Sequence, residues 1–261
     1  MPEMFHKAWD NPELLYSVIA GVMREGFFEE ALDPAAHLVQ IDSDRVRSTN
    51  VLGVALMQTG DLDGAEALFK DHLRDAGPAA IIMTNLAKIY STRGDAALAE
   101  QTLWTALTID PNYENGLVWW GALHREREDE PGFLEAMRQV AELPGSWRAQ
   151  LWLARKLLED DKLAEALDIY RAVLPDASED PNALTMISGD LCKNRHVREG
   201  YDLVAPLYDP AKHGLIAGVN LLQACIELGE KQQGRELLAT LRRLKRYDLS
   251  KILDKLEEQL R

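Results

Sequence analysis

The chain has 261 residues, of which 46% are hydrophobic and 28% are charged, values that are ordinary for a soluble globular protein. It contains no run of about 18 apolar residues, which argues against a membrane span, and only two cysteines, which excludes a disulfide scaffold. The formal net charge of −14 repels phosphate backbones, so nucleic acid is not an expected partner. Because the first residues lack a basic segment followed by an apolar one, no secretory signal is expected, and we expect a cytoplasmic protein.

Glycine and alanine recur every 34 residues in the N-terminal part of the chain. The residues that keep this spacing are Gly26, Gly60, Gly94, Ala31, Ala65 and Ala99. Two residue types that keep one spacing three times indicate an internal repeat. The first predicted helix pair covers residues 12–45, where Pro34 interrupts the second helix. The next, residues 46–79, keeps the pattern fully, with Gly53 in a small-residue position and Phe69 in an aromatic one.

The third pair, residues 80–113, is the clearest copy. Leu86, Ala87 and Tyr90 occupy the leucine, small-residue and tyrosine positions of a first helix, and Leu103 and Pro111 fall in the second helix and at its end. This pattern resembles the tetratricopeptide repeat, whose unit is two antiparallel helices joined by a tight turn. Small residues let the two helix backbones approach closely, and the glycine at the turn accepts a positive φ.

Four further units follow in the same register, at residues 114–146, 147–181, 182–214 and 215–247. The fourth contains adjacent tryptophans, of which Trp120 is expected to fill the space between the two helices of its own repeat. Trp119 is expected to face the surface and to form an aromatic strip with Trp152. Residues 248–261 read as one amphipathic helix, and a terminal cap is its favoured interpretation over a self-association surface.

The resemblance implies an all-α fold, a right-handed α-solenoid or superhelix that forms one domain over residues 1–261. It also implies that the first helix of each repeat lines a concave groove in which an extended peptide or a partner helix binds. The register then predicts which side chains face that groove. These candidates are Asn50, Thr84, Asn85, Lys88, Trp119, Arg125, Arg148, Trp152, Arg155, Asn220 and Gln223.

The candidate set mixes amides, cations and aromatic rings, and it is more basic than the chain as a whole. An acidic or carboxylate-ended partner segment would suit such a groove. Asn85 matches the central asparagine of the clamp with which some family members bind chaperone C-termini, but the required lysine, asparagine and arginine neighbours are missing. The chain is therefore expected to be a non-enzymatic interaction module, adaptor or scaffold. The alternatives are a self-associating protein, such as a homodimer through terminal repeats, and the repeat part of a larger multidomain protein.

No catalytic, metal-binding or cofactor-binding motif is recognisable. H-E-x-x-H, C-x-x-C, P-loop and G-x-S-x-G patterns are missing, and the six histidines have no metal-like spacing. Cys192 and Cys225 fall in the same core position of successive repeats, so two buried free thiols are expected. A basic run at residues 242–246 is expected to be a solvated helix face rather than a binding patch.

Overall fold

The computed structural model describes residues 3–246 and 250–260 as a succession of helices, and no strand occurs within these ranges. The chain divides into two compact units, Met1–Phe133 and Leu134–Arg261. The expected all-α class is confirmed. The prediction of a single domain over residues 1–261 stays a prediction. No helix in the described ranges is both long and apolar enough to cross a membrane.

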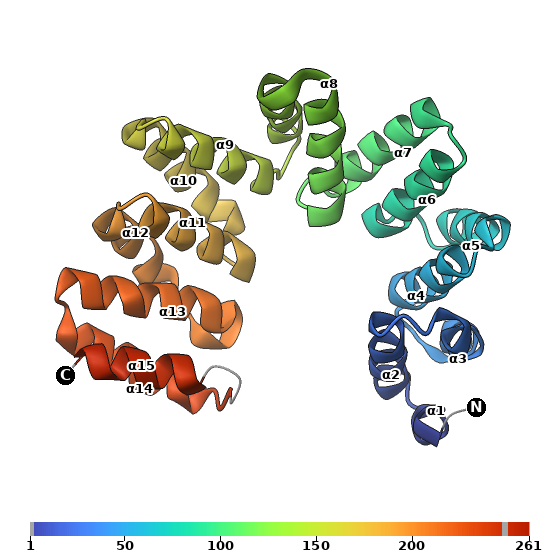
Figure 1. Ribbon diagram of the computed structural model, residues 1–261, viewed down its shortest axis with the longest axis horizontal. Helices are drawn as coiled ribbons and strands as arrows, with labels where there is room; N and C mark the ends of the chain where they lie inside the picture. The colour runs from blue at the N-terminus through green and yellow to red at the C-terminus, as the bar shows by residue number, and fades with distance from the viewer. Residues whose placement is uncertain (1–2, 247–249, 261) are drawn as a thin grey trace. The chain divides into compact units, whose positions relative to one another are not determined.

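The first unit is built from consecutive helices that pack against their neighbours in the chain (Figure 1). A short helix precedes three helix pairs, and a long helix, α8, begins in this unit. Pro34 was predicted to interrupt the second helix of the first pair, but it lies inside a continuous helix, Phe28–Ile41. The helices are α1 (Glu3–Ala8), α2 (Pro12–Arg24), α3 (Phe28–Ile41), α4 (Arg45–Gln58), α5 (Leu62–Asp75), α6 (Ala80–Thr92), α7 (Ala96–Ile109) and α8 (Glu114–Ala141).

The second unit repeats the same arrangement of helix pairs and ends in a single further helix (Figure 1). Its elements are α9 (Arg148–Glu159), α10 (Leu163–Ala177), α11 (Pro181–Lys193), α12 (Val197–Val204), the 3-10 helix η1 (Ala205–Leu207), α13 (Pro210–Leu228), α14 (Lys231–Arg243) and α15 (Ser250–Leu260). One apolar core joins α9 to α13, and a second joins α13, α14 and α15.

The turn between the two helices of a pair has the same backbone form in six pairs. One residue of each turn has a φ between 59° and 92°. Its N–H donates to the carbonyl three residues back, and the next N–H donates to the carbonyl five residues back. This is the left-handed helix ending that glycine favours. The six residues are Gly26, Gly60, Gly94, Asp161, Arg195 and Gly229.

The helix α8 bends where the turn of the fourth pair is expected. Glu128 and Asp129 leave the helical conformation, and Asp129 has a φ of 54° and a ψ of −143°. Arg125 spans the bend, because its guanidinium lies 4.0 Å from the ring centroid of Phe133 and donates to Glu130 at 3.0 Å. The fourth turn thus differs in form from the other six.

Of the adjacent tryptophans, Trp120 is buried and Trp119 is half-buried. The Trp120 ring lies 5.0 Å from the ring of Trp104 on α7. This neighbour belongs to the preceding pair, so Trp120 packs between two repeats. The sequence had predicted only that Trp120 fills the space between the two helices of its own repeat. The reason is that α7 also presents a large ring at this boundary.

The last helix packs against its own chain. Leu253, Leu256 and Leu260 of α15 are buried in the cluster that includes Leu222 and Leu238. Arg242 of α14 donates to Asp254 and Glu257 of α15, both at 2.7 Å. These contacts are those of a terminal cap. Residues 248, 249 and 261 of the predicted helix lie outside the described residues.

Candidate binding surface

The first helices of successive pairs lie next to one another and form one continuous face in each unit. In the first unit this face is made by α2, α4 and α6, and in the second by α9, α11 and α13. We call it the first-helix face. Side chains that reach from one first helix to the next cross it at several points, and most of them are polar.

In the first unit, Asn50, Asn85 and Lys88 form a connected polar group. Asn85 on α6 donates to the side-chain oxygen of Asn50 on α4 at 2.7 Å. The Lys88 ammonium donates to the Asn85 side-chain oxygen at 3.5 Å and is exposed. Desolvation lowers the pKa of Lys88, and no ion pair of this lysine is found among the described residues. An ammonium thus lies on this face without a carboxylate to balance it.

The other candidates of the first unit differ in accessibility. Thr84 is fully buried, and its hydroxyl finds no hydrogen-bond partner within the described ranges. It therefore does not contribute to the surface. Trp119 is half-buried on α8. Arg125 is exposed but engaged with Glu130 and Phe133 at the bend of α8.

Arg47 links the first two helix pairs and was not predicted from the sequence. Its guanidinium donates to both carboxylate oxygens of Glu13 on α2, at 2.7 and 2.8 Å, and to Asp42 at 2.9 and 3.0 Å. It also lies 4.9 Å from the ring centroid of Tyr16. Charges of opposite sign 34 residues apart, at Glu13 and Arg47, could have indicated this pair, because that spacing equals the repeat.

In the second unit, Arg155 of α9 and Asp190 of α11 form an ion pair across the face. The Arg155 Nε donates to Asp190 Oδ1 at 2.7 Å, and the buried Tyr170 hydroxyl lies 3.5 Å from Asp190 Oδ2. Burial raises the pKa of Asp190, and the Arg155 charge opposes this rise. The Arg155 side chain is 39% exposed, whereas that of Asp190 is only 8% exposed. Asp190 was also missed, although it lies one repeat after Arg155.

The Arg155 guanidinium is oriented through Nε alone. Neither Nη atom donates a hydrogen bond to a described residue, so four N–H groups remain on the exposed end of the fork. A guanidinium held in this way can receive a second carboxylate in a bidentate geometry. Trp152, half-buried, precedes Arg155 by about one helical turn on α9, so both side chains lie on the same side of this helix.

Arg148 and Asn220 serve contacts between repeats. Arg148 is buried, with its guanidinium 4.7 Å from the ring centroid of Trp147 and one Nη 3.8 Å from the Met186 sulfur. Asn220 on α13 donates to the Ser188 hydroxyl on α11 at 3.0 Å.

Gln223, one turn after Asn220, is exposed. Of the predicted candidates, Trp152, Arg155 and Gln223 of the second unit and Asn50 and Lys88 of the first combine the expected chemistry with an accessible place on the face, whereas Asn85 is buried between Asn50 and Lys88. Trp119 and Trp152 belong to different units, so the aromatic strip stays a prediction.

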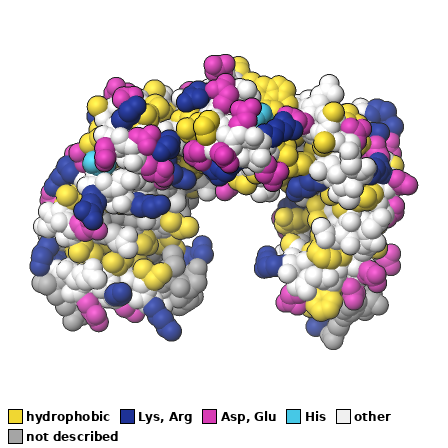
Figure 2. Space-filling view, turned by 45° about the horizontal axis from the view of Figure 1, so that its top comes forward, with side chains coloured by type: hydrophobic (Ala, Val, Ile, Leu, Met, Phe, Trp, Pro, Cys, Tyr) yellow, Lys and Arg dark blue, Asp and Glu magenta, His cyan; other side chains and the backbone are white. Residues whose placement is uncertain are grey.

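The charged surface lacks the pattern of a nucleic-acid binder on the face shown in Figure 2. There, acidic and basic side chains are interspersed over each unit rather than gathered into a basic stripe. Arg242 of the basic run pairs with the acidic side chains of α15. No group of three or more histidine, cysteine, aspartate or glutamate side chains could hold a metal ion within the described ranges.

The two cysteines are free thiols in core positions. Cys225 is buried and Cys192 is half-buried. Burial raises the pKa of both thiols, which keeps them protonated and weakly nucleophilic. The expectation of two buried thiols therefore holds fully for Cys225 and partly for Cys192.

Comparisons with known proteins point to one family. A family model described as tetratricopeptide repeat matches residues 23–80, 50–114 and 133–181, together more than half of the chain. No curated protein matches the chain in sequence.

Several solved structures are similar to the chain at low identity. PilF of Pseudomonas aeruginosa is 18% identical, with 81% of this chain and 96% of that chain covered and a TM-score of 0.42. A tetratricopeptide repeat protein from Parabacteroides merdae is 15% identical, with coverages of 95% and 98% and a TM-score of 0.41. The TPR2AB domain of yeast Sti1 in its complex with pHSP90 is 14% identical, with coverages of 95% and 98% and a TM-score of 0.37. The family model carries the assignment.

Proposed function

The chain belongs to the tetratricopeptide repeat family, and we propose that it is a non-enzymatic adaptor that binds an acidic segment of a partner protein on its first-helix face. The repeat family and the polar first-helix face support a role in protein interaction. The geometry of Arg155 supports an acidic partner. Its guanidinium is held through Nε by the buried Asp190, and its exposed Nη atoms donate no hydrogen bond to a described residue.

Among the common side chains, a carboxylate is the best ligand for the guanidinium of Arg155. Its planar fork matches a carboxylate through two parallel hydrogen bonds, and the fixed Nε lowers the entropy lost on binding. Trp152 nearby on the same helix supplies a ring of the kind that often anchors partners at interfaces.

Lys88 supports the same proposal in the first unit. Its ammonium is partly desolvated, which costs free energy unless an opposite charge is near. Since no described carboxylate pairs with it, an acidic residue of a partner would gain a charge-assisted hydrogen bond there without displacing an existing ion pair.

The test exchanges Arg155 for lysine. A lysine offers one nitrogen, which would pair with Asp190. The positive charge beside Asp190 is therefore kept, but the Nη donors that would bind a second carboxylate are lost. Removing the charge altogether would leave the buried Asp190 unpaired and would destabilise the protein by about 3–5 kcal/mol. Affinity capture from the native cell extract, followed by peptide mapping, identifies the bound segment, and calorimetry measures its Kd.

We expect Arg155→Lys to weaken binding of the captured acidic segment by about tenfold, which corresponds to about 1.4 kcal/mol. Arg171→Lys is the matched control, because Arg171 is exposed on α10 and its one ion pair with a described residue is to Asp168 in the same helix. If Arg155→Lys binds the segment as tightly as the wild type does, Arg155 does not receive a carboxylate and the assignment is wrong.

A further inference from the structure

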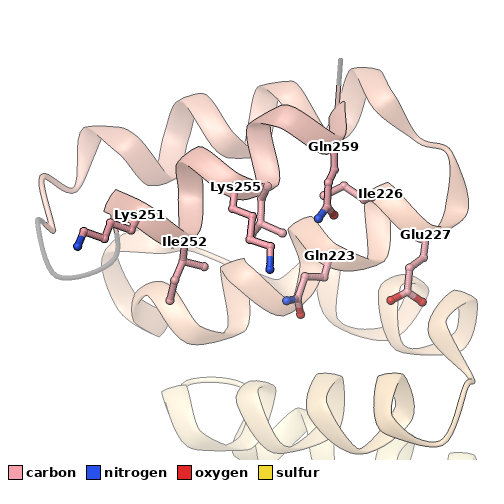
Figure 3. A pocket seen from close by; sticks show the side chains of 8 residues that line it. Gln223, Ile226, Glu227, Lys251, Ile252, Lys255 and Gln259 are labelled. Carbon is pink, nitrogen blue, oxygen red and sulfur yellow. The ribbon is translucent and has the colours of Figure 1, made fainter.

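A cleft lies between α13 and the capping helix α15, within the second unit. Its volume is about 450 Å³, which lies within the range of pockets that hold ligands. In Figure 3, Ile252 and Lys255 point from α15 toward α13, and Gln223 lies below Lys255. The lining residues used below are Gln223, Ile226, Glu227, Lys251, Ile252 and Lys255.

The walls of the cleft are fixed by the contacts that hold α15 against α13 and α14. Leu253, Leu256 and Leu260 are buried in the core shared with α13 and α14. Arg235 of α14 donates to the carbonyl of Leu260 at 3.1 Å, and Arg242 binds two acidic side chains of α15. Since the apolar stripe and both arginines hold α15 in place, the cleft exists without a ligand and need not be formed by one.

The charges in the cleft are arranged by sign. Lys251 and Lys255 are four residues apart, so both lie on one side of α15. No ion pair of either lysine is found in the part of the chain that the structure describes. Glu227 of α13 lies at the opposite end of the row of side chains from Lys251 (Figure 3).

Apolar surface lies between these charges. Ile252 is 44% exposed although the other apolar residues of α15 in the described range are buried. Ile226 lines the same cleft from α13. The amide of Gln223 provides both a donor and an acceptor, which suits the backbone of an extended peptide. The cleft thus combines a positive end, an apolar middle and a negative end.

We propose that this cleft is a second docking site, which binds an extended segment of another protein that has acidic residues next to an apolar one. The carboxylates lie at Lys251 and Lys255, the apolar side chain covers Ile252 and Ile226, and Glu227 excludes a further acidic residue at the far end. Charge complementarity selects this occupant, because the two lysines are the cations that line the cleft and neither forms an ion pair with a described residue. The site uses the capping helix and shares Gln223 with the first-helix face, but neither Trp152 nor Arg155 lines it.

The test measures fluorescence polarisation of labelled peptides with the full chain. The acidic probe contains Asp-Asp-Leu-Ile, and the control probe contains Lys-Lys-Leu-Ile. We expect saturable binding of the acidic probe only. The variant K251E/K255E should weaken it at least tenfold, and Glu227→Gln should strengthen it. The matched control K162E/K231E makes the same charge change at exposed lysines outside the cleft and should bind the probe like the wild type. If the charge reversal in K251E/K255E lowers the melting temperature, K251Q/K255Q repeats the test without it.

The outcomes separate this proposal from the function proposed above. K251E/K255E should weaken binding of the acidic probe at least tenfold but leave the Kd of the captured segment, which depends on Arg155, as in the wild type. If the wild type shows no saturable binding of the acidic probe, or if K251E/K255E binds it as tightly as the wild type does, the cleft is not a docking site. Loss of probe binding in Arg155→Lys but not in K251E/K255E would assign the peptide to the first-helix face and overturn the proposal for the cleft.

Discussion

The turns between helices place two side-chain-bearing residues, Asp161 and Arg195, in a conformation that glycine adopts in four other turns. Their φ angles are 59° and 66°, where a Cβ atom is crowded by the backbone. We expect Asp161→Gly and Arg195→Gly each to raise the free energy of unfolding by about 0.5–1 kcal/mol, because the relief of this strain exceeds the added chain entropy of glycine.

Chemical denaturation measures this change. Ala172→Gly, at an exposed position inside α10, serves as the control and should lose about 1 kcal/mol. A loss of stability in both turn variants would show that their native backbone carries no such strain.

The buried His72 is expected to make stability depend on pH. Its Nδ1 lies 3.1 Å from the Thr49 hydroxyl, and its Nε2 has no partner among the described residues. Burial, and secondly the charge of Arg45, lowers its pKa from 6.5. Because the folded pKa lies below the unfolded one, the neutral ring favours folding above the unfolded pKa, and this contribution is lost as pH falls through the folded pKa.

Denaturation between about pH 7 and about pH 5 should therefore show a steeper loss of stability in the wild type than in His72→Asn. The asparagine cannot titrate but keeps a hydrogen-bonding atom near Thr49. Equal slopes in the two proteins would mean that His72 takes up its proton in the folded state at no cost.

At the scale of helices, the close approach of α4 and α5 depends on Gly53. A Cβ atom there would lie 2.1 Å from Cζ of Phe69, which is fully buried. Gly53→Ala should therefore cost about 1–3 kcal/mol through overpacking. In Gly21→Ala, the new Cβ on α2 meets no atom within 4 Å, so this variant should gain about 0.5–1 kcal/mol from helix propensity.

The two variants make the same chemical change in neighbouring first helices, so thermal melts of both separate packing from propensity. The double variant Gly53→Ala with Phe69→Leu should recover part of the loss, because the smaller side chain frees the space. A tolerated Gly53→Ala alone would contradict the close packing.

Helix pairs were predictable from sequence because successive repeats place glycine at the same turn, where φ is positive, and alanine at the same buried contact. The contacts between repeats were harder to predict. Register gives the direction of a side chain but not the distance to the next helix, so it did not reveal that Thr84 and Arg148 are buried. The bend at Asp129 has no glycine to mark it. One further signal was available: the ion pairs Glu66–Arg93 and Glu100–Arg127 are the same pair one repeat apart.

At the scale of the whole molecule, the capping helix α15 covers the apolar surface of the last helix pair, α13 and α14. Because Leu253, Leu256 and Leu260 are buried against the chain itself, we expect the protein to be a monomer of 29.3 kDa in light scattering. Deleting residues 248–261 would uncover Leu222, Leu238 and Leu241, and each newly exposed leucine costs about 1.5–3 kcal/mol. The truncated chain should therefore melt at a lower temperature and self-associate as its concentration rises.

Ile252→Ser distinguishes a cap from an interface, because it removes the exposed apolar side chain of α15 without touching the buried ones. A cap predicts the monomer mass and a nearly unchanged melting temperature for this variant, since a half-exposed side chain contributes little to the core. A self-associating protein predicts instead that the wild type has twice the monomer mass and that Ile252→Ser restores the monomer. The mass of the wild type at high concentration decides between them, because Leu253, Leu256 and Leu260 are buried within the chain and Ile252 is the exposed apolar side chain of α15 in its described range.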